Sequence, residues 1–195
     1  SGDTPRLTNE RRHAEADKRA AIRRDLRIAR IARSGSVFAS VAREATVRIA
    51  IPIYEGFDEL DAIGPFEVFQ NAADAGADCA VGLYTVGDSE PTRVTASHGL
   101  RVEPDGRLPT PEEPDAPALL VVPGGGWNDR SAAGAYAEYD AGVIPEAVAE
   151  HHAAGATVAS VCTGGMLLAE AGVLDGRPAV THRGALDDLR ETDAV

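Results

Sequence analysis

The chain has 195 residues, of which 44% are hydrophobic, so it is long enough and apolar enough to fold around a substantial core. Its net charge of −12 is unevenly distributed: residues 1–45 hold 11 Lys or Arg against 6 Asp or Glu, whereas residues 46–195 hold 8 Arg, no Lys and 25 Asp or Glu. Because phosphate binding needs cationic side chains, nucleic-acid binding by this acidic part is not expected.

Neither a membrane span nor an export signal is expected, because the sequence has no run of about 18 apolar residues and no apolar N-terminal core. Two cysteines, Cys79 and Cys162, are too few for a disulfide framework, and we expect a reduced, cytoplasmic setting. The acidic composition suggests either a halophilic source, where salt screens the repulsion between acidic groups, or an ordinary acidic mesophilic protein.

Residues 1–45 differ in composition from the rest and are predicted to form a separate basic extension. Ile22, Leu26 and Ala29 stand at helical spacing among arginines, which predicts a basic helix that could bind an acidic surface. A mobile extension, or a start site assigned too early, is the alternative interpretation.

From Thr46 onward, apolar runs typical of strands alternate with segments of helical spacing. In chain order, strands are predicted at 47–54 and 79–86, two short strands at 93–105 with a turn at His98 and Gly99, and further strands at 118–123, 157–161 and 178–182. Helices are predicted from near Pro65 after a turn, at 142–155, after Thr163 and over 183–191. This alternation predicts an α/β fold, with a doubly wound, mostly parallel sheet sandwiched by helices.

In such sheets, ligands bind beyond the carboxyl ends of the strands, and three predicted strands lead to residues that suggest chemistry. Cys162 lies where a strand gives way to a helix, and two glycines follow Thr163. A helix N-terminus stabilises a thiolate, and the small glycines allow a sharp turn like the nucleophile elbow of serine hydrolases. Simple packing of a small apolar side chain is the alternative for an isolated cysteine.

The other two strands lead to a glycine-rich turn and to a carboxyl group. Gly124 and Gly125 can offer backbone N–H groups to an oxyanion, or can form only a turn; three contiguous glycines do not favour dinucleotide binding. Asp61 lies in an apolar stretch as either a helix N-cap, which the pattern alone favours, or a site acid. Trp127 would line a pocket or cover a core edge.

Five ordered segments within residues 46–190 resemble the ThiJ/PfpI superfamily, which has a flavodoxin-like, class I glutamine amidotransferase-like fold. These segments are the first strand, LDAIGPFEVF, SHGLRVEPD, LLVVPGGG and SVCTGGMLLAEAGVLDGRPAVTH. The Leu-Asp-x-x-Gly-Pro and Cys-Thr-Gly motifs resemble those of isonitrile hydratase and of the ligand-binding domain of certain AraC-type regulators. The intracellular peptidase branch has a histidine where this chain has Thr163, so peptidase activity is not implied.

The resemblance implies that Cys162 is the nucleophile, Asp61 the acidic residue beside it, Thr163 the neighbouring hydroxyl, and Gly124 or Gly125 the amide of the glycine turn. It also implies hydration of an isonitrile to an N-substituted formamide by a homodimer that acts on a small molecule. No cofactor is expected, and no metal-ligand spacing is present.

The remaining histidines and the second cysteine carry weaker predictions. His182 follows a short predicted strand and could reach the pocket, or be a core histidine. No role is predicted for His98, His151 and His152, and Cys79 is expected to be buried packing.

Two other functions remain open. One is a stress-response protein that acts on glyoxals or senses oxidants through Cys162, although such proteins usually have Glu where this chain has Asp61. The other is a non-catalytic ligand-binding domain, although no helix-turn-helix pattern follows residue 182. Since the superfamily usually continues with another strand and helix, we expect residues 46–195 to lack that C-terminal part and to pair through an exposed sheet edge.

Overall fold

The computed structural model describes residues 46–87 and 93–194 of the chain. The basic helix predicted around Ile22, Leu26 and Ala29 lies outside these residues, so the N-terminal extension stays a prediction.

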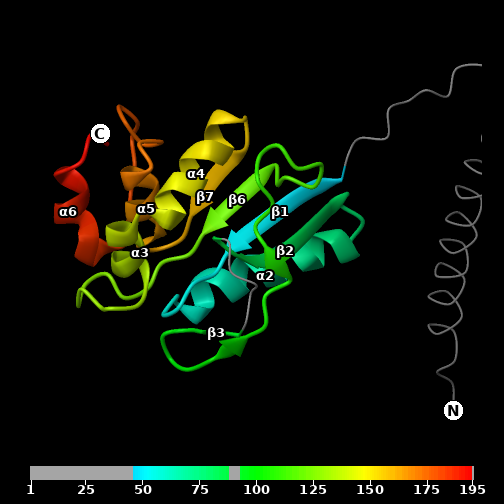
Figure 1. The fold of residues 1–195 in the computed structure, drawn as a ribbon, viewed down its shortest axis with the longest axis horizontal. Coiled ribbons are helices and arrows are strands. Elements are labelled where there is room, and N and C mark those ends of the chain that lie inside the picture. Colours follow the sequence, from blue (N-terminus) through cyan, green and yellow to red (C-terminus); the bar gives the residue numbers. More distant parts are fainter. Residues whose placement is uncertain (1–45, 88–92, 195) are drawn as a thin grey trace, which may run out of the picture. The chain divides into compact units, whose positions relative to one another are not determined.

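Within the described residues, a parallel five-stranded sheet forms the centre of the domain in the order β5-β2-β1-β6-β7 (Figure 1). Its strands are β1 (Val47–Pro52), β2 (Cys79–Thr85), β5 (Gly106–Arg107), β6 (Leu119–Val122) and β7 (Thr157–Ser160). The central strand β1 is buried over its last four residues, as expected for a continuous apolar run covered on both faces. The predicted parallel α/β fold is therefore confirmed.

Helices form most of the other regular elements of the domain. They are α2 (Glu59–Asp74), α3 (Ala135–Ala141), α4 (Val143–Ala153), α5 (Gly164–Glu170), the 3₁₀ turn η1 (Arg183–Ala185) and α6 (Leu186–Arg190). α2 packs against β2 and β6, and α4 and α5 pack against β7. α3 packs against α4 and α5. In residues 46–87 and 93–194, no helix is both long and apolar enough to cross a membrane.

A small antiparallel hairpin stands apart from the central sheet. It consists of β3 (Val94–Thr95) and β4 (Arg101–Val102), with the reversal at His98 and Gly99 that the sequence predicts. Gly99 has a φ of +92°, a conformation that glycine adopts without steric cost.

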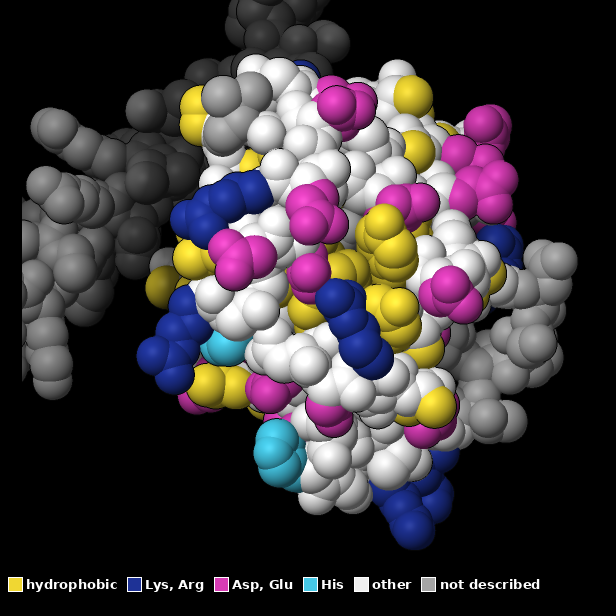
Figure 2. Space-filling model, turned by 90° about the vertical axis from the view of Figure 1, so that its left-hand side faces the viewer, with side chains coloured by type: hydrophobic (Ala, Val, Ile, Leu, Met, Phe, Trp, Pro, Cys, Tyr) yellow, Lys and Arg dark blue, Asp and Glu magenta, His cyan; other side chains and the backbone are white. Residues whose placement is uncertain are grey.

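The face of the domain at the α6 side mixes all side-chain types (Figure 2). Acidic side chains are spread over it with basic side chains between them, and apolar side chains gather near its centre. Acidic groups on this face are therefore dispersed rather than concentrated in one patch.

The prediction of a helix starting near Pro65 is wrong, because α2 begins at Glu59. The Asp58 side chain caps it: its Oδ1 accepts a hydrogen bond from the N–H of Leu60 at 3.1 Å. Pro65 lies inside the helix, where it removes one backbone hydrogen bond without ending it. The capping role that the pattern favoured for Asp61 thus belongs to Asp58, which has the extended backbone of an N-cap, and Asp61 lies in the first turn.

The prediction of a strand at 178–182 is also wrong, since this segment has no strand geometry. Pro178 has no N–H to donate to a strand ladder. Thr181 instead contacts the turn that follows β7: its Oγ1 donates to the carbonyl of Cys162 at 3.1 Å. The edge strand β5 and helix α3 are additions that the sequence patterns did not indicate.

Candidate active site

The carboxyl ends of three adjacent strands bring the predicted site residues together. Asp61 lies in the first turn of α2 after β1, Gly124 and Gly125 follow β6, and Cys162 and Thr163 follow β7. The Gly124 N–H donates to Asp61 Oδ2 at 3.1 Å, and the Gly125 N–H donates to Thr163 Oγ1 at 3.0 Å. These five residues therefore form one connected cluster at the edge of the sheet where ligands bind in this fold.

Cys162 occupies the turn between β7 and α5. Its φ is +54°, a left-handed conformation that costs an L-residue about 1–2 kcal/mol. Hydrogen bonds hold the chain on both sides: the Val161 N–H donates to the Val122 carbonyl at 3.0 Å, and Thr181 Oγ1 donates to the Cys162 carbonyl. A half-buried cysteine held in a disfavoured conformation at a strand-to-helix turn has the geometry of a nucleophile elbow.

The glycine turn after β6 approaches this elbow more closely than any side chain would permit. A Cβ on Gly124 would lie 2.5 Å from Thr163 Oγ1 and 2.6 Å from the Thr163 backbone nitrogen. Gly125 has a φ of +120°, which also favours glycine. These two glycines let the backbone amides reach the carboxyl and the hydroxyl of the site.

Asp61 and Cys162 lie close enough to affect each other's ionisation, and Asp61 is only 7% exposed. Burial raises the pKa of the Asp61 carboxyl, although hydrogen bonds from Gly124 and Cys162 act in the opposite direction. Burial also raises the pKa of the Cys162 thiol, and the negative charge of Asp61 raises it further. The site therefore disfavours two adjacent negative charges and favours one shared proton.

The start of α5 was expected to stabilise the Cys162 thiolate. Hydrogen bonds from the Thr163 backbone and side chain do lower the pKa of the thiol, but burial and Asp61 outweigh them. The amides of Gly124 and Gly125, expected to stabilise developing charge, already donate to Asp61 and Thr163 in this structure. They position the acid and the hydroxyl.

Cys162 and Thr163 line a cleft of about 690 Å³, a volume typical of small-molecule sites. Its walls include side chains from the segment after β1, the β3–β4 hairpin, the loop after β6 and the segment after α5. Among them are Asp58, Ser97, His98, Trp127, Asn128 and His182.

His182 lies in the wall of this cleft, so it does reach the pocket that holds Cys162. Its Nδ1 accepts a hydrogen bond from the N–H of Gly184 at 3.1 Å and lies 3.4 Å from Asn128 Nδ2. This network assigns the ring proton of the neutral form to Nε2.

Trp127 meets both of its predicted alternatives, since it lines the cleft and is only 3% exposed. Its ring packs edge-on against Tyr136 and Tyr139, at centroid distances of 5.5 and 5.2 Å. Its Nε1 donates to Asp188 Oδ2 at 2.5 Å, and Asp188 also pairs with Arg130 at 3.0 Å. Helix α6 thereby fixes one wall of the cleft.

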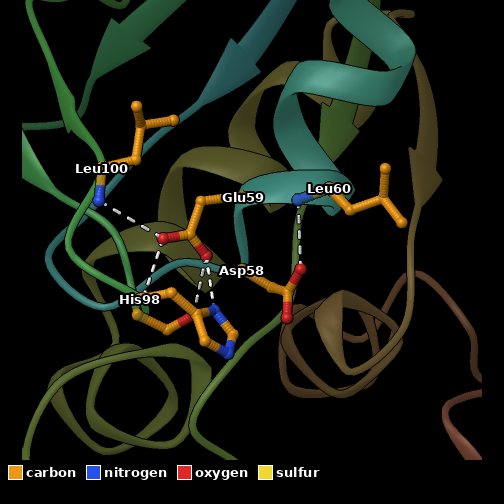
Figure 3. Close-up of polar contacts among 6 residues, drawn as sticks. Asp58, Glu59, Leu60, His98 and Leu100 are labelled. Carbon is orange, nitrogen blue, oxygen red and sulfur yellow. Dashed lines mark hydrogen bonds and ion pairs between the residues drawn. The ribbon is translucent and has the colours of Figure 1, made fainter.

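Sequence reasoning missed a second carboxyl-based cluster at the cleft (Figure 3). Glu59 Oε2 lies 2.8 Å from His98 Nδ1 and accepts from Ser97 Oγ at 3.0 Å, and Glu59 Oε1 accepts from the His98 backbone N–H at 2.7 Å. The only available signal was that the first turn of α2 and the hairpin turn both belong to segments of the family resemblance.

Within this cluster, Glu59 and His98 each shift the pKa of the other. Burial alone would raise the pKa of Glu59, but hydrogen bonds from His98 and Ser97 lower it to about 2. The same carboxylate raises the pKa of His98 above its ordinary value, through the hydrogen bond and through its charge.

Within residues 46–87 and 93–194, no group of three or more His, Cys, Asp or Glu side chains could hold a metal ion.

The sheet order and the cysteine elbow define an α/β protein of flavodoxin-like fold. The chain belongs to the DJ-1/PfpI family, whose family model matches residues 47–195. The superfamily indicated by the five sequence segments is therefore confirmed, and a cysteine-based enzyme or a stress-response role fits this family.

Individual relatives agree with this assignment. An uncharacterized protein in the cpoL 5′ region of Streptomyces lividans is 33% identical over 135 residues, which cover 69% of this chain and 86% of that protein. Drosophila melanogaster DJ-1beta has a TM-score of 0.61 and 18% identity, covering 77% of this chain and 74% of its own. A two-domain protein of Anabaena variabilis with DJ-1/ThiJ/PfpI-like and ferritin-like domains has a TM-score of 0.60 and 21% identity, covering 76% of this chain but only 38% of its own. At these identities the two structures support the fold alone.

Proposed function

We propose that the chain is a cysteine-dependent enzyme that hydrates a small isonitrile to an N-substituted formamide. One observation carries this proposal: the Cys162 thiol lies at a cleft that can hold a small molecule, close enough to the buried Asp61 carboxyl for each group to change the pKa of the other. The Leu-Asp-x-x-Gly-Pro and Cys-Thr-Gly motifs, which contain these two residues, support the same branch of the family.

In the first step, the proton shared by Cys162 and Asp61 moves to the isonitrile carbon. The thiolate then attacks this carbon, and the new carbon–sulfur bond gives a thioimidate, R–N=CH–S–Cys162. A carboxyl whose pKa is raised by burial suits this step, because it can hold the proton until the substrate arrives.

In the second step, Asp61 takes a proton from water, and the resulting hydroxide attacks the thioimidate carbon. Asp61 passes this proton to the nitrogen, the carbon–sulfur bond breaks, and the proton of the attacking hydroxide moves to the sulfur, which releases R–NH–CHO and returns the thiol. One isonitrile and one water thus give one formamide, and the residues end in their starting protonation states.

The alternative is a stress-response protein that acts on glyoxals or senses oxidants through Cys162. Membership in the DJ-1/PfpI family is compatible with this role. Oxidant sensing, however, needs a thiolate, and burial and Asp61 both raise the pKa of this thiol. A non-catalytic ligand-binding domain would use the same cleft without turnover.

We also propose that the chain forms a homodimer and acts in the cytoplasm. A halophilic source predicts that the free energy of unfolding increases in concentrated salt. Members of the family are commonly homodimers. Leu60 and Val68, at i and i+8 on α2, are 76% and 64% exposed and provide apolar surface that a second copy would bury. Sedimentation equilibrium of wild type and Leu60→Gln tests this, and a monomeric wild type would contradict it.

Formamide production from a simple alkyl isonitrile tests the proposed reaction. Cys162→Ala and Asp61→Ala should abolish turnover, while Cys79→Ala should retain it, because Cys79 lies on β2 away from the cleft. Circular dichroism first establishes that each variant folds. A well-folded wild type that produces no formamide would rule out the hydratase proposal and leave the alternatives above.

A further inference from the structure

His98 lines the cleft that holds Cys162, yet the proposed hydration uses no group from its hairpin. Glu59 holds it through the backbone N–H at 2.7 Å and through Nδ1 at 2.8 Å, and Ser97 Oγ adds a third contact to the same carboxyl. Glu59 lies in the same helical turn as Asp61. The imidazole is therefore anchored to the element that carries the site acid.

This anchoring leaves one ring nitrogen of His98 to contact a ligand. A carboxylate oxygen can only accept, so Nδ1 carries the hydrogen that faces Glu59. Nε2 points away from Glu59 (Figure 3), and it makes no hydrogen bond within the described part of the chain. The side chain is 78% exposed, so Nε2 is accessible from the cleft.

The charges around the cleft indicate what this nitrogen would bind. Glu55, Asp58 and Asp129 line the cleft, and no lysine or arginine is among its described lining residues. Glu59 also offsets the charge of a protonated His98. An anionic ligand would be repelled by these carboxylates, whereas an uncharged carbonyl oxygen can accept a hydrogen bond from the Nε2–H of the protonated ring, the form of His98 that Glu59 favours.

We propose that His98, held by Glu59, is a substrate-binding residue that recognises an uncharged oxygen acceptor, such as an ester or amide carbonyl, away from the reacting carbon. This inference rests on the proposed function for the reacting group, but it assigns the substrate class: small electrophiles that carry a neutral polar group.

Matched substrates test the assignment. Methyl isocyanoacetate carries an ester, and n-pentyl isonitrile has the same number of non-hydrogen atoms but no oxygen. For His98→Gln, KM for the ester should rise about tenfold, as expected for one lost hydrogen bond, with kcat unchanged. KM for the alkyl isonitrile should stay within about twofold of wild type.

Two variants serve as controls. Glu59→Gln keeps the shape of the side chain but weakens its hold on His98, so it should raise KM for the ester by less than His98→Gln does. His152 lies on α4 outside the cleft, so His152→Gln should leave KM unchanged for both substrates. An equal loss for both substrates, a change confined to kcat, or no change in KM would overturn the assignment.

A binding experiment separates this inference from the proposed reaction. Cys162→Ala protein labelled with ¹⁵N-histidine is titrated with N-formylglycine methyl ester, and the Nε2 resonance of His98 is followed. We expect this resonance to shift while that of His152 does not. A shift without isonitrile turnover by the wild type would reject the reaction and keep the recognition, whereas turnover without a shift would reject the recognition alone.

Discussion

Glu59 and Asp61 lie two residues apart in the first turn of α2, yet the pKa values of their carboxyl groups are shifted in opposite directions. Burial raises the pKa of Asp61, which faces the Cys162 thiol at 7% exposure. Glu59, whose side chain is 21% exposed, accepts hydrogen bonds from the hairpin that lower its pKa to about 2. One helical turn therefore supplies a carboxyl suited to holding a proton and a carboxylate suited to holding a histidine.

The largest expected effect comes from removing the charge of the buried carboxyl. Asp61→Asn should reduce isonitrile hydration by about a hundredfold or more, because it removes the acid and base of both steps. The same change should lower the pKa of the Cys162 thiol, since the nearby negative charge raises it. Alkylation by iodoacetamide should therefore become faster at a fixed pH, while hydration becomes slower.

The measurement uses a Cys79→Ala background, so that one thiol remains, and follows the alkylation rate against pH. An unchanged alkylation profile would mean that the charge of Asp61 does not affect the sulfur.

A smaller effect is expected from displacing the amide that holds Asp61. Gly124→Ala should destabilise the fold by about 1–3 kcal/mol, because the new Cβ would clash with the backbone and the side chain of Thr163. Urea unfolding measures the loss. Gly106→Ala is the matched control, since no heavy atom lies within 4 Å of its added Cβ, and equal losses in both variants would contradict the role of close approach.

The smallest expected effect concerns the ion pair of Glu59 and His98. The pKa of Glu59 is depressed from 4.5 to about 2, so its stabilising contribution is present above pH 4.5 and is lost as the pH falls toward 2. The pKa of His98 is raised from 6.5, so its contribution is present below pH 6.5 and is lost as the pH rises through the raised value. Coupling between the two should be greatest from pH 4.5 to 6.5.

A double-mutant cycle of Glu59→Gln and His98→Gln measures this coupling by urea unfolding across that range. The energy should be small, because His98 is largely exposed. A coupling that does not vary with pH would show that the contact is not ionic.

Much of the fold follows from local patterns in the sequence. The continuous apolar run of β1 predicts a strand because both of its faces are covered by other parts of the domain. Cys162 can be predicted as a candidate nucleophile because it follows a predicted strand directly and is followed by Thr163 and two glycines. The start of α2 was harder to predict, since Asp58 and Asp61 are both acceptable caps. Only packing against the turn after β6 buries one and leaves the other at the helix end.

The Glu59–His98 pair depends on contacts that no local pattern contains. Its two members are separated by 39 residues, and they meet because the hairpin β3–β4 folds back over the start of α2. Likewise, the segment 178–182 has the composition of a strand, but Thr181 uses its side chain to bind the elbow carbonyl. Side chains that serve tertiary contacts override the local preference of the backbone.

Trp127 is the single tryptophan of the chain, and it stands in the cleft wall with its indole nitrogen bonded to Asp188. Its fluorescence emission therefore arises from one known position beside the candidate site. A ligand that enters the cleft should alter that emission without any label, which gives a direct optical titration of binding for substrates, products and inhibitors alike.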